Sequence, residues 1–531
     1  MSPRGISRSA RDPSLLRLAD AILIPPFSGT TPPDWLLAAL DGGLAGVTLF
    51  GGNVAGSDQL AQLTERLRSV TPEPVIAIDE EGGDVTRLAH LTGSPYPGNA
   101  ALGAVDDPAL TRRVYHAIGG DLAATGINVD LAPSVDVNTA ADNPVIGTRA
   151  FGADTQLVSR HAAAAVTGLQ DAGVAACAKH FPGHGSTRED THDVLATVPG
   201  GLDAVWRRDL PPFQAAVAAE VKGVMTGHLR VPELTGELPA TLSHEALTGL
   251  LRDRLGFGGV IVTDALDMRA VRGVDDRRDI PASAVLATAA GADLLCLGRD
   301  HDEAMYLAVR AVLADAVAGG RLRAERLEEA AARVRQLREW LARAGEPPTN
   351  PDGAVGLLAA RRAAQLSGMR RPGTGLALPR LLAGLASAGA SELPWRPLVM
   401  QLEPRANIAV GAVPWGLGPW LADGDVLQVP LPQQSGPIVA ETIRTALQRA
   451  VGRQLIVVVR DAHRYPAAKK LIKAVLAARP DATVVEMGLP IWRPEVGTYL
   501  ATYGAGRVNC QVAAEILGLN HRDGLRRRRA H

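Results

Sequence analysis

The sequence has little cysteine and no excess of charge of either sign. Its three cysteines, Cys177, Cys296 and Cys510, are far apart and odd in number, which argues against a disulfide framework and against cysteine-rich zinc sites. The 55 Lys and Arg residues balance 56 Asp and Glu residues. Because this balance gives no global field, we expect neither nucleic acid nor anionic lipid as a partner, and any charged site must be local.

Long hydrophobic runs are also missing. No uninterrupted stretch of about 18 apolar residues occurs, so no segment is expected to span a membrane. The apolar stretch near the N-terminus is broken by Arg17, Asp20 and a Pro25-Pro26 pair, so it lacks the core of a signal peptide. With few cysteines, this pattern predicts a cytoplasmic protein.

The composition is otherwise that of a globular protein. Aromatic residues make up only 4% of the chain, but 46% of its residues are hydrophobic and 21% charged, so Ala, Leu and Val can fill a sizeable core. The 531 residues leave room for two domains, because one α/β barrel takes roughly 250 residues.

Short apolar runs alternate with longer amphipathic stretches in the first 300 residues, a pattern typical of βα units that form a parallel sheet. Eight such units can close into a TIM-type (β/α)8 barrel, which we assign to residues 15–345 after a flexible N-terminus at 1–14. The eight runs are Ala21–Pro25, Gly46–Phe50, Pro74–Asp79, Ile127–Ala132, Ala176–Phe181, Gly223–His228, Gly259–Asp264 and Ala292–Gly298.

A Pro-rich linker at 346–353 separates the barrel from a second α/β region at 354–520, which we predict to be a smaller doubly wound domain. It has no glycine-rich nucleotide fingerprint. The basic tail at 521–531 is expected to be disordered and is given no function. Strands are expected at Pro397–Leu402, Asn407–Val413, Asp425–Leu431, Gln454–Arg460 and Ala482–Gly488, and helices at Ile438–Ala450 and Ala467–Ala478.

Ionisable residues stand at the carboxyl ends of four of the barrel runs. They are Asp79, the Lys179-His180 pair, His228 and Asp264. In an α/β barrel these ends converge on one rim, where active sites are built. Each could instead cap a helix or pair with a neighbour, but four together favour a site.

The loop after Lys179-His180 is dense in functional side chains and adds His184, Asp190 and His192. Asp190 and His192 are two residues apart, so the carboxylate can orient the imidazole and favour its protonated form, as a general acid requires. A histidine satisfied by a local turn is the alternative.

A metal site is the rival interpretation of this loop. His180 and His184 have the spacing of a helical ligand pair, but Pro182 and Gly183 between them make a helix improbable. The first strand also lacks a His-x-His pair. We therefore expect no metal and no other cofactor, with a metal-dependent barrel hydrolase kept as an alternative.

Asp264 ends an apolar run that delivers one carboxylate to the rim. An anionic, compact carboxylate suits nucleophilic attack on an oxocarbenium-like sugar carbon, although capping of the following helix is also compatible with it. Asp79 can accept sugar hydroxyl hydrogen bonds, and Arg87 adds a forked donor. Arg149 is weaker evidence for a sugar site, because a loop arginine is usually a surface charge.

These segments together resemble the β-N-acetylglucosaminidases of glycoside hydrolase family 3, of the two-domain bacterial type. The resemblance covers roughly residues 15–345, and its most specific part is the Lys179–Gly185 segment with Asp190 and His192. The matching segments are Asp79–Gly83 with Arg87, Gly147–Arg149, Lys179–Gly185 with Asp190 and His192, His228 with Pro239–Ser243, and Thr263–Met268.

The resemblance implies a retaining, exo-acting enzyme that removes terminal N-acetylglucosamine from a small carbohydrate, such as a muropeptide from cell-wall turnover. Asp264 matches the nucleophile, and His192, paired with Asp190, matches the acid/base. Residues that match sugar-binding positions are Asp79, Arg87, Arg149, Lys179 and His180, and His228 is also taken as substrate-binding. In the two-domain members the second domain is expected to be mainly structural.

One departure stands out, because the family usually has Arg where this chain has Asp84, which can alter the charge of the rim. An N-acetylglucosamine phosphorylase is the nearest alternative, since a histidine acid/base avoids the repulsion that a carboxylate offers to phosphate. A sugar-binding protein without catalysis is opposed by the presence of Asp264, Asp190 and His192 together. The sequence does not indicate an oligomeric state.

Overall fold

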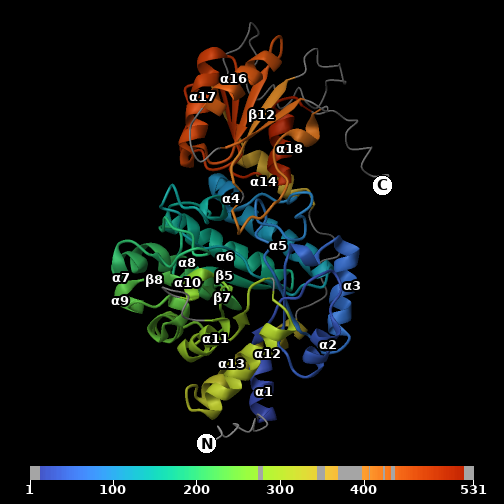
Figure 1. Cartoon of the computed structure of the whole chain (residues 1–531), viewed down its shortest axis with the longest axis vertical. Helices are drawn as coiled ribbons and strands as arrows, with labels where there is room; N and C mark the ends of the chain where they lie inside the picture. The colour runs from blue at the N-terminus through green and yellow to red at the C-terminus, as the bar shows by residue number, and fades with distance from the viewer. Residues whose placement is uncertain are drawn as a thin grey trace, which may run out of the picture.

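The computed structural model describes residues 12–272, 279–299, 301–343, 353–368, 397–405, 407–421, 425–431 and 437–519. An N-terminal barrel and a smaller α/β domain stack along the long axis of the molecule (Figure 1). The expected fold class is confirmed. The predicted linker at 346–353, apart from Gly353, the tail at 521–531 and most of the predicted flexible N-terminus lie outside the described residues.

The barrel strands lie within the eight predicted runs, with an extension of one residue at Ala175. Six strands pair in parallel in the order β2-β3-β4-β5-β7-β9, and β1 pairs with β10. A parallel bridge between Val262 and Leu294 joins β9 to the β10 segment. The barrel closes at the other side because the Thr48 amide donates to the Pro25 carbonyl at 3.3 Å. The strands are β1 (Leu23–Ile24), β2 (Gly46–Leu49), β3 (Val75–Ile78), β4 (Val129–Asp130), β5 (Ala175–Phe181), β7 (Gly223–Thr226), β9 (Val260–Val262) and β10 (Leu295–Cys296).

Helices surround this barrel (Figure 1). Several begin where a side chain caps free amides, as at Asp107, which accepts from the Leu110 amide, and at Asp154, which accepts from the Leu157 amide. A small extra ribbon pairs β6 (Ala196–Thr197) with β8 (Leu229–Arg230). The α-helices are α1 (Pro13–Asp20), α2 (Asp34–Asp41), α3 (Ser57–Arg68), α4 (Asn99–Val105), α5 (Pro108–Ala124), α6 (Thr155–Asp171), α7 (Gly201–Ala204), α8 (Leu210–Ala218), α9 (Pro232–Thr235), α10 (Arg269–Arg272), α11 (Ile280–Ala290), α12 (Glu303–Ala318) and α13 (Ala324–Arg343).

The inside of the barrel is packed rather than open. Small and β-branched side chains fill it, among them Ala45, Val75, Ala77 and Val129, together with Cys177. Because every strand is covered by helices on its outer face, the strands are apolar on both faces, which is why they appear in the sequence as continuous apolar runs. Among the described residues, no helix combines the length and apolarity needed to cross a membrane.

The C-terminal domain has a six-stranded sheet in the order β11-β16-β15-β14-β12-β13, parallel except for β11 at one edge. Four of the five predicted strands and both predicted helices are present. The strands are β11 (Gln365–Ser367), β12 (Leu398–Glu403), β13 (Val426–Pro430), β14 (Leu455–Val459), β15 (Thr483–Glu486) and β16 (Thr498–Ala501), and the helices are α14 (Val355–Ala363), α16 (Pro437–Arg449), α17 (Pro466–Ala478) and α18 (Arg507–Ile516).

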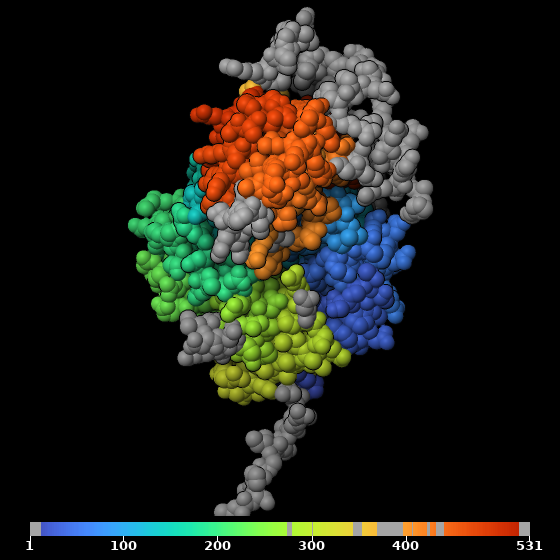
Figure 2. Space-filling model, turned by 45° about the horizontal axis from the view of Figure 1, so that its top comes forward, coloured from blue at the N-terminus to red at the C-terminus, as the bar shows by residue number. Residues whose placement is uncertain are grey.

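The strand predicted at Asn407–Val413 is wrong, because this segment is a loop. The Asn407 side chain accepts from the Val410 amide and donates to the Pro144 carbonyl of the barrel domain, so the apolar residues of the loop pack against the barrel instead of entering the sheet. Figure 2 shows the C-terminal domain, orange to red, standing over barrel segments coloured green and blue.

Candidate active site

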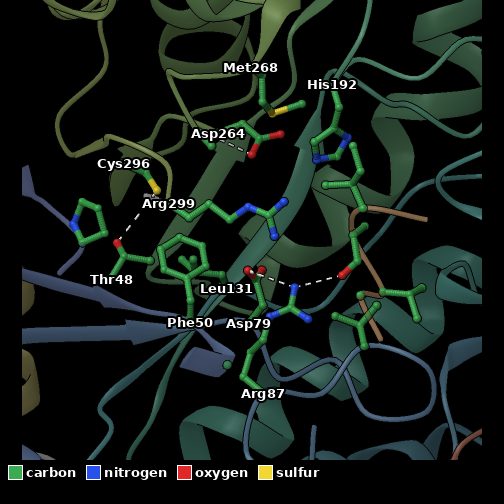
Figure 3. A pocket seen from close by; sticks show the side chains of 18 of the residues that line it. Thr48, Phe50, Asp79, Arg87, Leu131, His192, Asp264, Met268, Cys296 and Arg299 are labelled. Atoms are coloured by element: carbon green, nitrogen blue, oxygen red, sulfur yellow. Dashed lines mark hydrogen bonds and ion pairs between the residues drawn. The ribbon is translucent and has the colours of Figure 1, made fainter. Parts of the chain in front are cut away.

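A cavity of about 670 Å³ opens at the carboxyl ends of the barrel strands. It brings together residues of β2, β5, β7 and β10 and of the loops that follow β3, β5 and β9, which are far apart in the sequence. Figure 3 shows Asp79, Arg87, His192 and Asp264 around this space. The predicted site residues that line it are Asp79, Arg87, Arg149, Lys179, His180, His192 and Asp264.

Asp264 follows β9 and turns its carboxylate toward the cavity (Figure 3). One of its oxygens accepts the Ala265 amide at 2.8 Å. Burial alone would raise the pKa of Asp264, but the imidazole rings of His228 and His180 and this amide hold the pKa below its ordinary value. The carboxylate is therefore anionic at neutral pH, as a nucleophile must be.

His192 lies on the loop after β5 and forms a tight pair with Asp190. Its Nδ1 is 2.7 Å from Asp190 Oδ1, and the same oxygen accepts the His192 amide at 2.9 Å. Burial lowers the pKa of His192, but the hydrogen bond and charge of Asp190 and the charge of Asp264 outweigh it, so the pKa is raised. Because Nδ1 is engaged, Nε2 is the nitrogen available for proton exchange.

The loop that carries His192 docks on the segment after Asp264. The Arg269 amide donates to the His192 carbonyl at 3.3 Å, and the Ala270 amide donates to the Thr191 carbonyl at 3.4 Å. These contacts join the two segments directly and hold both side chains at one cavity. His192 and Asp264 are accordingly both among the residues that line this cavity.

A buried network of charges forms the floor of the cavity. Lys179 Nζ lies 2.6 Å from Asp79 Oδ1 and 2.8 Å from Glu81 Oε1. Arg149 binds Glu81 through two hydrogen bonds of 2.9 and 2.7 Å. Burial would raise the pKa of Glu81, but the two cations push it far below the ordinary value, so Glu81 stays ionised and holds both of them in place.

Both Lys179 and His180 reach the cavity although they are neighbours on one strand. Successive side chains on a regular strand point to opposite faces. The register of β5 with β7 shifts between Ala178 and Phe181, and this irregularity breaks the alternation. His180 accepts from Arg149 at Nε2 (3.2 Å), since a guanidinium only donates, and its Nδ1 contacts Asp136 Oδ2 at 2.7 Å.

Arg87 is held from two sides. Its amide donates to Glu80 Oε2 at 2.8 Å, and the same oxygen accepts the Thr86 hydroxyl and the Leu88 amide. Its guanidinium donates to the Ala409 carbonyl of the C-terminal domain at 2.9 Å and lies 3.9 Å from Asp79 Oδ2. The Asp79 carboxylate thus lies between the cations of Lys179 and Arg87, and 22% of its side chain stays exposed.

His228 occupies a different position from the one expected for a sugar ligand. It is fully buried, with Nδ1 2.8 Å from the Thr241 hydroxyl and Nε2 2.9 Å from the Ala265 carbonyl. Burial lowers its pKa, which fits a neutral ring that donates from Nε2. Within the described part of the chain it supports the segment after Asp264 and is not among the residues that line the cavity.

His184 lines the cavity but is bound within its own loop. Its ring nitrogens contact the hydroxyls of Thr187 at 2.7 Å and Thr191 at 3.1 Å, and burial lowers its pKa to about 4. It therefore shapes the loop as a neutral ring. Over the described residues, no three His, Cys, Asp or Glu side chains are arranged to hold a metal ion.

Several lining residues were missed by sequence reasoning. Glu81 lies inside the Asp79–Gly83 motif, so its charge was a usable signal. Phe50, His90 and Arg299 also line the cavity, but in the sequence they are a residue at the end of an apolar run and two loop residues that no motif marks. Figure 3 shows Arg299 reaching into the cavity.

The C-terminal domain also lines the cavity, through Ile408–Val413. The expectation that this domain is mainly structural stays a prediction. The structure adds that its apolar loop extends onto the barrel rim, instead of joining the sheet, and forms part of the cavity wall.

The chain matches the family model described as the glycosyl hydrolase family 3 N terminal domain over residues 37–337. A β-hexosaminidase A from Pseudoalteromonas piscicida is 36% identical in an alignment of 340 residues, and the match covers 59% of this chain and 56% of that protein. A β-hexosaminidase from Stenotrophomonas maltophilia (strain K279a) is 37% identical in an alignment of 281 residues, and the match covers 51% of this chain and 81% of that protein.

The second domain also has a counterpart among solved structures. The structure of a glycoside hydrolase family 3 β-N-acetylglucosaminidase from Paenibacillus sp. str. FPU-7 superposes with a TM-score of 0.79 at 32% sequence identity. The superposition covers 96% of this chain and 97% of that one, so both domains are shared.

Proposed function

This chain belongs to glycoside hydrolase family 3, and from that premise we propose that it is a retaining exo-β-N-acetylglucosaminidase. The observation that carries the proposal is the cavity lined by Asp264 and His192, with Asp190 bound to the far nitrogen of the imidazole. The relatives named β-hexosaminidase support the choice of an N-acetylated sugar.

In the first displacement, a carboxylate oxygen of Asp264 bonds to the anomeric carbon while the bond to the glycosidic oxygen breaks. The protonated Nε2 of His192 donates its proton to that oxygen, so the aglycone leaves as an alcohol. The raised pKa of His192 supports this step, because the ring carries its proton over a wider pH range.

In the second displacement, neutral His192 accepts a proton from water as the water oxygen bonds to the anomeric carbon. The bond to Asp264 breaks, and the sugar leaves with its original β configuration. The lowered pKa of Asp264 suits it as a leaving group as well as a nucleophile, because the carboxylate is the stable form at neutral pH.

The test is to follow hydrolysis of an aryl β-N-acetylglucosaminide by NMR. We expect the β anomer of N-acetylglucosamine to form first, and a fluorinated mechanism-based substrate to label Asp264, located by mass spectrometry of the digested protein. The Asp264→Ala variant should lose turnover and labelling. Initial release of the α anomer would exclude the double displacement.

The alternative of an N-acetylglucosamine phosphorylase is favoured by one feature, namely that the acid/base candidate is an imidazole and not a carboxylate. A neutral or cationic ring does not repel incoming phosphate. Incubation with the aryl sugar with and without phosphate separates the two activities, because only a phosphorylase forms the sugar 1-phosphate.

We further propose that the natural substrate is a muropeptide-derived fragment. Comparison of kcat/KM for an N-acetylglucosaminyl-muramic acid fragment and for chitobiose tests this choice. Equal values for the two would point to a general hexosaminidase.

A further inference from the structure

Asp84 does not face the rim of the cavity, contrary to the expectation from its departure from the family pattern. It is buried, with 6% of its surface exposed. Its Oδ2 lies 3.0 Å from Arg460 of the C-terminal domain and accepts the Thr148 hydroxyl at 2.7 Å. Its Oδ1 accepts the Ala505 amide, also of the C-terminal domain, at 2.8 Å. All of its strong partners thus lie at the boundary between the domains.

Arg460 directly follows β14 and is half-buried at the same boundary, with 16% of its side chain exposed. Its guanidinium stacks over the Trp415 ring at 5.2 Å. Burial disfavours the charge of Arg460, but the nearby Asp84 and Asp461 carboxylates outweigh it and raise its pKa. The two ions therefore compensate each other in a place that water does not solvate well.

The Arg460–Asp84 pair lies directly behind the charged floor of the cavity. Asp84 belongs to the segment 79–87, which carries Asp79, Glu81 and Arg87, and its partner Thr148 precedes Arg149. A small cavity of about 10 Å³ is lined by Glu81, Asp84 and Arg149 from the barrel and by residues 503 and 504 from the C-terminal domain. One carboxylate thus ties both arginine-bearing segments to the second domain.

The backbones of the two domains also approach closely at this point. A Cβ atom on Gly506 would lie 3.0 Å from the Cα of Gly83, which is next to Asp84. Arg87 adds a second tie through the Ala409 carbonyl. The position of the 79–87 segment therefore depends on contacts from the C-terminal domain in its middle, at Gly83 and Asp84, and at its last residue, Arg87.

We propose that Asp84 and Arg460 are positioning residues, through which the C-terminal domain sets the places of Arg87 and Arg149 in the sugar site. This inference rests on the proposed function, in which those two arginines bind the sugar. A carboxylate at position 84 is needed because its partner is the guanidinium that the second domain places at this boundary. The pair should thus affect substrate binding more than the chemical steps.

The experiment uses the full chain with Asp84→Asn, Arg460→Gln and the conservative Arg460→Lys. Arg362→Gln is the matched control, because Arg362 of α14 also pairs across the domain boundary, with Asp107 at 2.7 Å, but away from the cavity. For each variant, KM and kcat are measured with an aryl β-N-acetylglucosaminide, the Kd of N-acetylglucosamine by calorimetry, and Tm by thermal unfolding.

We expect Asp84→Asn and Arg460→Gln to raise KM and Kd about 10-fold or more with kcat changed less than about threefold. Arg460→Lys should recover part of the loss, and Arg362→Gln should leave KM and Kd unchanged. Since the conservative variant keeps the charge, it also gives a result if Arg460→Gln does not fold.

A fall in Tm with KM and Kd unchanged in the Asp84 and Arg460 variants would reduce the pair to a structural contact and overturn the inference. An equal effect of Arg362→Gln would also overturn it, because any boundary contact would then suffice. Arg149→Ala, measured in parallel, distinguishes a failure of this inference from a failure of the proposed sugar site. If that variant binds N-acetylglucosamine normally, the sugar site itself is wrongly assigned.

Discussion

The Asp190–His192 pair is the residue-scale feature that sets the chemistry. Its 2.7 Å contact leaves only Nε2 for proton exchange and favours the imidazolium. The sequence showed an aspartate and a histidine two residues apart, but a histidine in such a loop can also have both ring nitrogens bound by residues of the loop itself. His184 shows this alternative in the same loop, because both of its nitrogens are bound by threonines.

The pH dependence of activity follows from this pair. The pKa of His192 is raised, with Asp190 countering burial, so the protonated acid is lost only as pH rises through that raised value. We expect Asp190→Asn to move the alkaline limb of kcat/KM to lower pH by about 1 unit, since a carboxylate neighbour is removed. Because the pKa of Asp264 lies below its ordinary value, ionisation of Asp264 should produce no acid limb above pH 4 in either protein. The measurement is the rate profile from pH 4 to 10. An unchanged alkaline limb would show that Asp190 does not raise the pKa of His192.

Leaving groups distinguish a general acid from a binding residue. We expect His192→Ala to lower kcat/KM by about 100-fold or more for a disaccharide, whose alcohol needs a proton, and by far less for a nitrophenyl glycoside. Steady-state kinetics over a series of aryl leaving groups provide the measurement. Equal losses across the series would show that His192 does not donate the proton.

At the scale of elements, loops decide how the strands present their residues. Gly83 has a φ of +58°, and an added Cβ would meet Gly98 at 2.5 Å, so the 79–87 turn tolerates no side chain there. The need for glycine at position 83 comes both from the conformation of the turn and from the close approach of Gly98. The sequence shows the two glycines but not that they meet.

Substitution at this turn should therefore be costly. We expect Gly83→Ala to lower the free energy of unfolding by about 2 kcal/mol or more, because strain and a backbone clash add. Gly320→Ala is the control, since Gly320 has a φ of +70° with open space around it, and should cost about 1 kcal/mol. Urea unfolding of both variants compares them, and a similar loss in each would mean that the clash relaxes freely.

At the scale of the whole molecule, one end of the barrel carries the cavity and the other end carries a cluster of ion pairs that stabilises the fold. The cavity lies at the carboxyl ends of the strands, whereas Asp293 comes just before β10 and binds Arg326 at 2.5 Å, Arg333 at 3.3 Å and also Arg252. It also accepts the amide of Ile261, the middle residue of β9. This cluster joins β9 and β10 to helix α13 at the opposite end of the barrel from the cavity.

Loss of that cluster should affect stability and not specificity. We expect Asp293→Ala to lower the free energy of unfolding by about 3–5 kcal/mol, because buried guanidinium groups lose their counterion. KM for the folded fraction should not change. The control Glu339→Gln removes an exposed pair with Arg343 and should cost less than about 1 kcal/mol. A large rise in KM for Asp293→Ala at 10 °C would contradict the division of tasks between the two ends.

The sequence by itself determined the eight barrel strands and the residues at their carboxyl ends, because strands covered on both faces appear as continuous apolar runs and closure brings their ends to one rim. Only the tertiary structure decided that Asn407–Val413 leaves its sheet to line the cavity, that His228 stands behind Asp264, and that Asp84 meets Arg460. The physical reason is that these outcomes depend on contacts between segments far apart in the chain, and local patterning carries no information about such contacts.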